Sequence, residues 1–382
     1  MTLIKFPFES SRSSRLSAPL RVALAISMVA ALAACGGGGG SDSTSSTSSS
    51  GGTSTGSASG SGSSIPTSGT LVASAPTPTY AAGSDQLSAY TELETARQAA
   101  GAGALIQSTQ IDTAASAHAT YLGDNYAQHG ISHTEDPSLP GYYAASLTDR
   151  LNTAGVQYAL AGEGVAGVNS STLATGGDCV SQLLNSVYHL AGLLSPMTHV
   201  GIGTDATTSA GLPLQLCVVD MATASDDSVG QLPASGAIVA YPYAGQSNVP
   251  ASWQPGGETP RVPVAIVPNQ IAGTPIAISI CNADYSNLSD AGTLVPTLTA
   301  FTLKDASGNL VPVAIITHAA IQAGANVSLT ADTTGDIGRG MAVMVPLAAL
   351  NVNATYTVTV AATLKAGGSV LTKTWSFSTG AN

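Results

Sequence analysis

The hydrophobic pattern of this chain changes its period near residue 230, and this change divides the sequence into two parts. Between residues 80 and 225, apolar residues recur at the three- and four-residue spacing of amphipathic helices. Beyond residue 233, short β-prone runs are separated by turn residues, a pattern typical of a β-sandwich. The sequence therefore predicts an α+β domain over 79–228, followed by an all-β sandwich over 233–382.

The first part carries signals for three helices and a hairpin. Each helical stretch has an apolar stripe and is bounded by a polar cap residue, a glycine or a proline. Two β-prone runs after the last stretch are joined by a loop of glycine, threonine and serine. The predicted elements are helices over 85–100, 109–125 and 178–194, and strands over 199–204 and 214–221.

The second part is predicted to be built from short strands. Turn sequences such as 305–309 and 366–368 separate them. The final two strands resemble those of bacterial Ig-like domains, which implies a spacer or adhesion role. In the last strand, Trp375 and Phe377 alternate as core residues do. His318, after the predicted strand 311–317, is expected to be solvated at a strand end. The predicted strands are 236–243, 262–267, 275–281, 298–303, 311–317, 341–345, 355–363 and 370–379.

The first 34 residues are predicted to be a signal peptide that is absent from the mature fold. A basic leader precedes an apolar run over 22–32, which is too short to span a bilayer. The run ends in Leu-Ala-Ala-Cys, which resembles the lipobox of bacterial lipoproteins. Cys35 is therefore expected to carry a diacylglycerol that anchors the protein without a membrane helix. An ordinary secreted protein with an incidental Cys35 is the alternative.

Residues 35–78 are predicted to form a disordered tether behind the lipidated cysteine. The tract is mostly glycine, serine and threonine, and it has too little apolar surface to fold. No aspartate follows Cys35, which favours the outer membrane over the inner one in a cell with two membranes.

The chain is acidic, with a formal charge of −11, and only Arg97 and Arg150 are cationic between residues 80 and 225. Nucleic acid is therefore not an expected partner.

The cysteines indicate an oxidising compartment. Outside the cytoplasm, Cys179 and Cys217 are expected to form a disulfide because both fall in the first folded part. Cys281 would then be a buried free thiol. The chain has no CxxC pattern, so a thiolate metal site or a redox motif is not expected.

Three histidines differ in where they lie relative to the predicted helices. His118 lies within the apolar stripe of helix 109–125 and is expected to be a hydrogen-bonded core residue. His189 lies opposite the stripe of helix 178–194, so it is expected to face solvent or a cleft if that helix continues so far. His133 follows helix 109–125 in a polar turn with Glu135.

Taken together, several short motifs resemble a bacterial CAP (SCP-type) domain. The superfamily includes cysteine-rich secretory proteins, venom antigens and plant pathogenesis-related proteins. Order and spacing agree over about 140 residues. The resemblance implies an α-β-α sandwich with a central cleft lined by histidines and acids. The motifs are Ala-Ala-Ser-Ala-His118, Ile-Ser-His133, Thr-Asp-Arg150-Leu, Ala-Gly-Glu163-Gly, His189 with Leu-Leu-Ser-Pro, and Val-Gly-Ile-Gly203.

Carried onto this chain, the resemblance assigns His133, Glu163 and His189 to a cleft that binds a metal or a ligand. Two imidazoles and one carboxylate are a reasonable donor set for Zn²⁺, with water filling the remaining positions. The second acid of the family has no match, because Asp178 lies at the wrong end of its helix. No catalytic residue is assigned, since neither a second carboxylate nor a nucleophile motif accompanies the trio.

Three hypotheses about function follow from these assignments. The first is an anchored lipoprotein whose CAP-like domain binds a small or apolar ligand, such as a lipid or sterol, with or without a divalent metal. The second is a metal-dependent hydrolase of envelope or extracellular material. The third is a structural or adhesive surface protein whose working part is the sandwich. The missing acid favours binding over catalysis.

Overall fold

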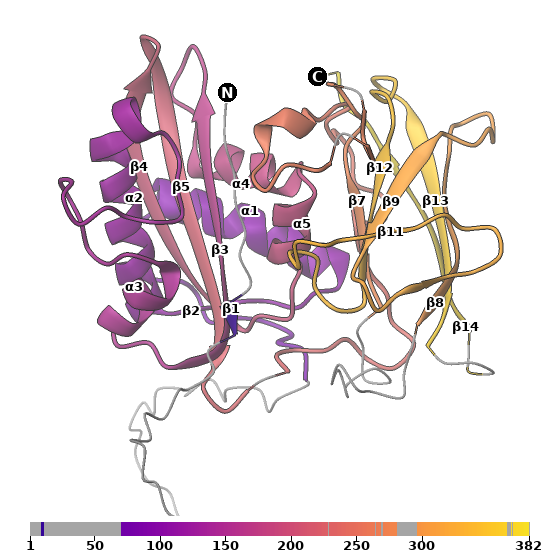
Figure 1. Cartoon of the computed structure of the whole chain (residues 1–382), viewed down its shortest axis with the longest axis horizontal. Coiled ribbons are helices and arrows are strands. Elements are labelled where there is room, and N and C mark those ends of the chain that lie inside the picture. Colours follow the sequence, from indigo (N-terminus) through magenta and orange to yellow (C-terminus); the bar gives the residue numbers. More distant parts are fainter. Residues whose placement is uncertain are drawn as a thin grey trace, which may run out of the picture. The chain divides into compact units, whose positions relative to one another are not determined.

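The computed structural model is a mixed α and β structure, as the sequence predicts (Figure 1). Its strands form three sheets, and the α-helices of the described residues all lie between Asp85 and Leu193. The structure describes residues 9–10, 70–227, 229–263, 265–268, 270–280, 296–364, 368 and 370–381. Cys35, Cys281, the remaining leader residues and the tether up to residue 69 lie outside this described part.

The first two helices form where the sequence predicts them. Helix α1 (Asp85–Ala100) begins at Ser84, whose hydroxyl accepts from Leu87 N, and ends at Gly101 in the left-handed conformation. Helix α2 (Thr109–His129) begins at Ser108, which caps it in the same way, and runs one turn longer than predicted. Local capping and apolar periodicity are sufficient to specify both helices.

The first sheet has three long antiparallel strands. They are β3 (Tyr158–Asn169), β4 (His199–Ser209) and β5 (Leu212–Ala224), with β5 in the centre. Short strands β2 (Ile106–Gln107) and β1 (Glu9–Ser10) complete the order β1-β3-β5-β4-β2. The sequence did not predict β3, because this strand is buried on both faces and rich in glycine and alanine, so it lacks alternation and has few β-prone residues.

Helices cover both faces of this sheet (Figure 1). On one face, α2 and α3 (Leu147–Thr153) pack on even-numbered residues of β5 such as Val218. On the other face, α1, α4 (Gly176–Leu184) and α5 (Tyr188–Leu193) pack on odd-numbered ones such as Val219. The single helix predicted over 178–194 is therefore wrong, because the chain leaves helical geometry at Asn185 and starts a separate helix at Tyr188.

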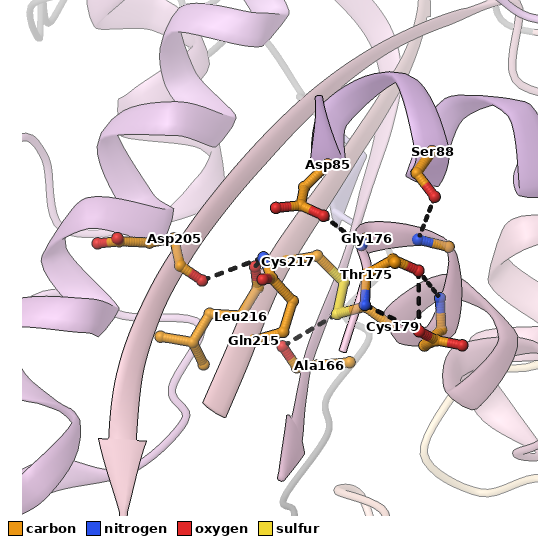
Figure 2. Close-up of a disulfide and its surroundings, with 12 residues drawn as sticks. Asp85, Ser88, Ala166, Thr175, Gly176, Cys179, Asp205, Gln215, Leu216 and Cys217 are labelled. Carbon is orange, nitrogen blue, oxygen red and sulfur yellow. Dashed lines mark hydrogen bonds between the residues drawn. A yellow bond between two sulfur atoms is a disulfide. The ribbon is translucent and has the colours of Figure 1, made fainter. Parts of the chain in front are cut away.

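A disulfide joins Cys179 of α4 to Cys217 of β5, as predicted (Figure 2). Next to it, α1 and α4 approach closely at their N-terminal ends. Asp85 and Ser88 of α1 accept hydrogen bonds from Gly176 N and Gly177 N, which are otherwise unpaired at the start of α4. The disulfide therefore ties this helix pair to the central strand of the sheet.

Removing this disulfide should lower the free energy of unfolding by about 2–4 kcal/mol, because the crosslink closes a loop of 38 residues in the unfolded chain. The test is urea unfolding of the oxidised protein and of the double variant Cys179→Ala, Cys217→Ala. Adding a reductant should destabilise the parent and leave the variant unchanged. Equal stability of the two oxidised proteins would contradict the expectation.

Two sheets packed face to face form the second part of the chain. Alternate residues of β12, such as Ala342 and Met344, meet Phe301 and Val358 of the opposite sheet in a shared core. One sheet has the order β10-β8-β13-β14 and comprises β10 (Gln322–Ala323), β8 (Thr297–Lys304), β13 (Thr355–Thr363) and β14 (Val370–Ser378). The other has the order β11-β9-β12-β7-β6 and comprises β11 (Thr330–Ala331), β9 (Val313–Thr317), β12 (Met341–Pro346), β7 (Ile276–Ser279) and β6 (Val239–Tyr241).

One predicted strand is absent from the described residues of its segment. Residues 262–267 have no strand hydrogen bonding, and a short 3-10 helix (Pro255–Gly257) precedes them. Pro260, Pro263 and Pro268 flank or interrupt this run, and proline has no N–H to donate to a sheet. The apolar side chains are nevertheless buried, at Val262 and Val267. Their burial explains why the hydrophobic pattern resembled a strand.

The five-stranded sheet of the sandwich is buried on both faces. Met341, Val343 and Val345 point away from the sandwich core and join the cluster that also contains α1, α4 and α5. Glu258, in the second part of the chain, also contacts the first part, because its carboxylate accepts hydrogen bonds from Val187 N and Tyr188 N. Residues 65–382 accordingly fall in one compact unit.

Residues 70–78, which the sequence assigns to the end of the tether, have a defined place in the fold. Val72 is buried, its N–H donates to Gln231, and its carbonyl accepts from Ala104 N. Residues 70–78 lack strong apolar periodicity, so only these long-range contacts place them. No helix in the described ranges is both long and apolar enough to cross a membrane.

Candidate functional site

A buried polar cluster lies between the first sheet and the α2–α3 layer. Its members come from five elements, and each has a side chain with almost no access to solvent. Charged groups are rarely buried without partners, so their contacts determine what this region can do. The cluster comprises His118 of α2, His133 and Glu135 of the following loop, Arg150 of α3, Glu163 of β3 and Asp220 of β5.

Glu163 is the centre of the buried polar cluster. Its Oε1 lies 2.6 Å from His133 Nδ1, and its Oε2 accepts from Arg150 Nη2 at 2.5 Å. Arg150 Nη1 also donates to the carbonyl oxygen of His133 at 3.2 Å. Two of the three predicted cleft residues, His133 and Glu163, are therefore brought together, and Arg150 holds both.

Opposing electrostatic effects act on this pair. Burial favours the neutral form of Glu163, but the Arg150 guanidinium, His118 and the hydrogen bond from His133 outweigh it, so the pKa of Glu163 lies well below its usual value. For His133, burial dominates over the attraction of Glu163, so the pKa of His133 is lowered. At neutral pH the pair is thus a carboxylate hydrogen-bonded by a neutral imidazole.

His118 is a hydrogen-bonded core residue, in agreement with its position in the apolar stripe. Its Nδ1 lies 2.9 Å from Glu135 Oε1, and its Nε2 lies 2.9 Å from the carbonyl oxygen of Ser132. Because Glu135 also accepts from Tyr143 N and Ala144 N, the His118–Glu135 pair orders the loop that carries His133.

Asp220 is another carboxyl group of the buried polar cluster, and it was not among the site residues predicted from the sequence. It lies directly opposite Glu163 in the β3–β5 pairing, and both side chains are fully buried. Burial first, and then the Glu163 charge, raise the pKa of Asp220 well above its usual value. A protonated Asp220 can donate a hydrogen bond to Glu163, and its oxygens have no other partner in the described part of the chain.

Replacing Asp220 by asparagine should therefore remove a pH-dependent loss of stability. The unfolded aspartate releases its proton near pH 4, while folded Asp220 keeps it to higher pH, so the free energy of unfolding falls as pH rises across this window. The loss is about 1.4 kcal/mol per pH unit for one proton. Asparagine stays neutral and can still donate to Glu163.

The measurement is denaturant unfolding of both proteins between pH 5 and 8. The stability of Asp220→Asn relative to the parent should increase with pH. A constant difference across this range would show that Asp220 does not retain its proton in the folded protein.

His189 is fully buried and does not face solvent, because it belongs to the separate helix α5. Its Nδ1 lies 3.0 Å from Glu258 Oε1 and 3.1 Å from Ser186 Oγ. Glu258 also accepts from three backbone N–H groups at the start of α5. Charge on His189 would lower the pKa of His133, so the two imidazoles interact electrostatically.

The predicted trio is thus split between two sets of contacts. His133 and Glu163 bind one another, whereas the hydrogen bonds of His189 reach Glu258 in the second part of the chain. Among the described residues, no group of three or more histidines, cysteines or acids has the geometry to hold a metal ion. Both oxygens of Glu163 are already engaged, so a zinc ion would have to displace His133 or Arg150. Zinc binding stays a prediction.

Sequence reasoning missed Asp220 and Glu258 for different reasons. Asp220 directly follows four apolar residues in β5, and a charge inside such a run was a usable signal. Glu258 lies in a proline- and glycine-rich loop outside the predicted domain, and nothing local indicates its contact with His189. Asp178, in contrast, caps the start of α4 with Thr175.

An apolar cavity of about 380 Å³ lies apart from the buried polar cluster. None of His133, Glu163 and His189 lines it. Its size falls in the range of small-molecule sites, and its wall is mainly aliphatic. The wall includes Leu160, Leu194 and Met197 from the first part of the chain, and Val239, Ile337 and Met341 from the second.

No protein-family model matches the chain, and no curated protein sequence matches it.

Proposed function

We propose that this protein is an exported lipoprotein, anchored through acylated Cys35, that binds a small apolar ligand in the apolar cavity. The cavity carries the proposal, because it offers an aliphatic wall of suitable size for such a ligand. The α-β-α layers support membership of the CAP type, and the two packed sheets support an Ig-like sandwich. The ligand site then differs from the histidine cleft that the resemblance implies.

The buried polar cluster serves as a structural framework in this proposal. Glu163 has Arg150 and His133 on its two oxygens, and Glu135 is bonded to His118 and two backbone N–H groups. A carboxylate with such partners is a poor general base, because the same contacts lower its affinity for a proton. The geometry therefore favours ligand binding over hydrolysis.

Binding can be measured with N-phenyl-1-naphthylamine, a neutral probe that fluoresces in apolar sites. We expect saturable 1:1 binding to the purified full chain, and loss of binding in Val229→Trp, which places an indole at the cavity wall. Val352→Trp, at an exposed residue away from the cavity, is the matched control and should bind like the parent. Absence of saturable binding, or equal binding by Val229→Trp, would contradict the proposal.

Anchoring has a separate test in cells that acylate exported proteins. The parent should incorporate radiolabelled palmitate and sediment with membranes, and Cys35→Ser should do neither. Membrane association of an unlabelled Cys35→Ser protein would show that another feature holds it there. The placement in the outer membrane is checked by separating the two membranes on a density gradient.

A further inference from the structure

Gln231 lies in the short stretch that the sequence assigns to neither folded part, and its buried side chain lines the apolar cavity. The side-chain oxygen Oε1 accepts from Val72 N at 2.9 Å. The side-chain nitrogen Nε2 donates to the carbonyl oxygens of Ala104 at 2.9 Å and of Met197 at 2.6 Å. The amide of Gln231 therefore joins three segments that are far apart in the sequence.

The cavity wall that Gln231 contacts has no regular secondary structure. Leu194, Pro196 and Met197 line the cavity, and they lie between the end of α5 and the start of β4. Gln231 binds this stretch through its backbone as well, because its N–H donates to the carbonyl oxygen of Pro196 at 2.8 Å. Proline has no N–H, and no helix or strand ladder holds residues 194–197, so side-chain contacts have to fix their position.

Arg97 of α1 is the second side chain that holds this wall. It is fully buried, and its guanidinium donates to backbone carbonyl groups on both sides of the stretch that Gln231 binds. The acceptors are the carbonyl oxygens of Leu193 at 2.5 Å, Ser195 at 2.9 Å, Met197 at 3.4 Å, Ala102 at 3.0 Å and Gly103 at 3.1 Å. Arg97 thus connects the wall to α1, and Gln231 connects it to the segment around Val72.

The segment around Val72 is the end of the predicted tether. Val72 is buried, and its carbonyl oxygen accepts from Ala104 N at 2.9 Å. Val72, Ala104 and Gln231 therefore form a closed set of three hydrogen bonds. Gly103 makes room for this set, since a Cβ there would overlap Gln231 Oε1 and the side chain of Leu71. One side chain consequently links the tether end to the cavity wall.

We infer that Gln231 is the positioning residue of the ligand site, which fixes the wall at 194–197 and couples it to residues 70–72. This inference rests on the proposed function and deepens it, because the position of the wall sets the length of apolar ligand that fits. Loss of the amide would remove the donor to the buried carbonyl group of Ala104. The wall should then move until its polar groups find other partners, and the cavity should change its dimensions.

The test measures how tightly 1-octanol, 1-decanol and 1-dodecanol displace bound N-phenyl-1-naphthylamine, since these neutral ligands differ only in chain length. In the parent, affinity should rise with length until the cavity is filled. Gln231→Leu should change this ranking and weaken the tightest ligand by about tenfold, because binding must then bury a carbonyl group without its donor. A purely structural role would alter stability and leave the ranking unchanged.

Gln215→Leu is the matched control. Gln215 is also buried, and its amide donates to two backbone carbonyl groups, those of Asp205 and Leu216, outside the cavity wall. The variant removes the same chemical group and should keep the parent's ranking and affinities.

Val72→Pro is an independent test at the tether end, because proline cannot donate to Gln231. The variant should change the ranking in the same direction as Gln231→Leu. Thr77→Pro, at an exposed residue of the same segment, should bind like the parent. Because Val72→Pro leaves Gln231 in place, it decides the question if Gln231→Leu does not fold.

The outcomes separate this inference from the proposed function. A parent-like ranking in either Gln231→Leu or Val72→Pro would overturn the inference and leave apolar binding intact. An equal change in Gln215→Leu would also overturn it, since the loss of any buried glutamine would then have the same effect. Failure of the probe to bind the parent would instead reject the proposed function.

Discussion

Replacing Gly203 by alanine should lower the free energy of unfolding by about 3 kcal/mol. A Cβ at this position would lie 2.0 Å from the carbonyl oxygen of Ala115 and 2.6 Å from the nitrogen of Ser116, both in the backbone of α2. Gly201 meets the same helix one turn earlier, at Ile111 and Asp112. The two glycines thus allow the helix backbone to contact the strand directly.

Helix α2 cannot move aside without breaking polar contacts. Asp112 accepts from Ile202 N at 2.9 Å, from Tyr80 Oη at 2.5 Å and from Gln107 Nε2 at 2.6 Å. Overpacking of a rigid interior costs typically 1–3 kcal/mol, and the contact with fixed backbone places this case at the upper end. The penalty therefore reflects displacement of the helix from the strand that it covers.

Urea unfolding of Gly203→Ala provides the measurement, with Gly256→Ala as the control. At Gly256 the new methyl group would meet only the Arg261 side chain, at 3.7 Å, so its effect should stay within about 0.5 kcal/mol. Similar stability of the two variants would mean that α2 does not lie against β4 at this distance.

Replacing Arg150 by methionine should cost about 3–5 kcal/mol, because it removes one partner of a buried ion pair and leaves the other. Glu163 would lose the guanidinium that lies 2.5 Å away, and Glu135 would lose the same group at 3.8 Å. Asp220, the acid opposite Glu163, would add to the unbalanced negative charge at high pH.

The pH dependence of this loss has a predictable sign. In the parent the pKa of Glu163 is depressed, so its stabilising charge is present above the unfolded value near 4.3 and is lost only in strong acid. Without Arg150 the folded carboxyl should hold its proton to higher pH than the unfolded chain does. The difference between parent and variant should therefore shrink as pH falls from 8 to 5.

A second variant separates charge from packing. Arg150→Met combined with Glu163→Gln removes the unpaired charge and should recover part of the lost stability. The exposed Arg261→Met serves as the charge-matched control and should stay close to the parent. A pH-independent loss in Arg150→Met, unaffected by Glu163→Gln, would show that the aliphatic contacts of Arg150 account for the effect.

Local signals were sufficient wherever the structure depends on neighbouring residues. Ser84 and Gly101 bound α1, Ser108 starts α2, and the alternation of Trp375 and Phe377 places both in the core of the sandwich. The disulfide was also predictable, since only two cysteines fall within the first folded part. These elements follow from capping, periodicity and composition, which a single segment contains.

Where a partner lies far along the chain, local reasoning was insufficient. The helix predicted over 178–194 divides at Asn185, and Glu258, some 70 residues later, caps the second piece. The apolar residues Val262 and Val267 are buried without being in a strand, because Pro263 lacks a donor and Ile266 N and Val267 N donate to the Pro263 carbonyl oxygen in a turn. In both cases a contact or a missing donor outweighed the apolar pattern.

By itself, the sequence determined the α+β class, the change to strands near residue 230, the disulfide and the residues His133 and Glu163. Only the tertiary structure decided that Asp220 faces Glu163, that Glu258 holds His189, and that His133, Glu163 and His189 do not line the aliphatic cavity. The physical reason is the range of the interactions involved. Helix caps and strand alternation act over a few residues, whereas burial brings together charges and apolar walls from distant segments.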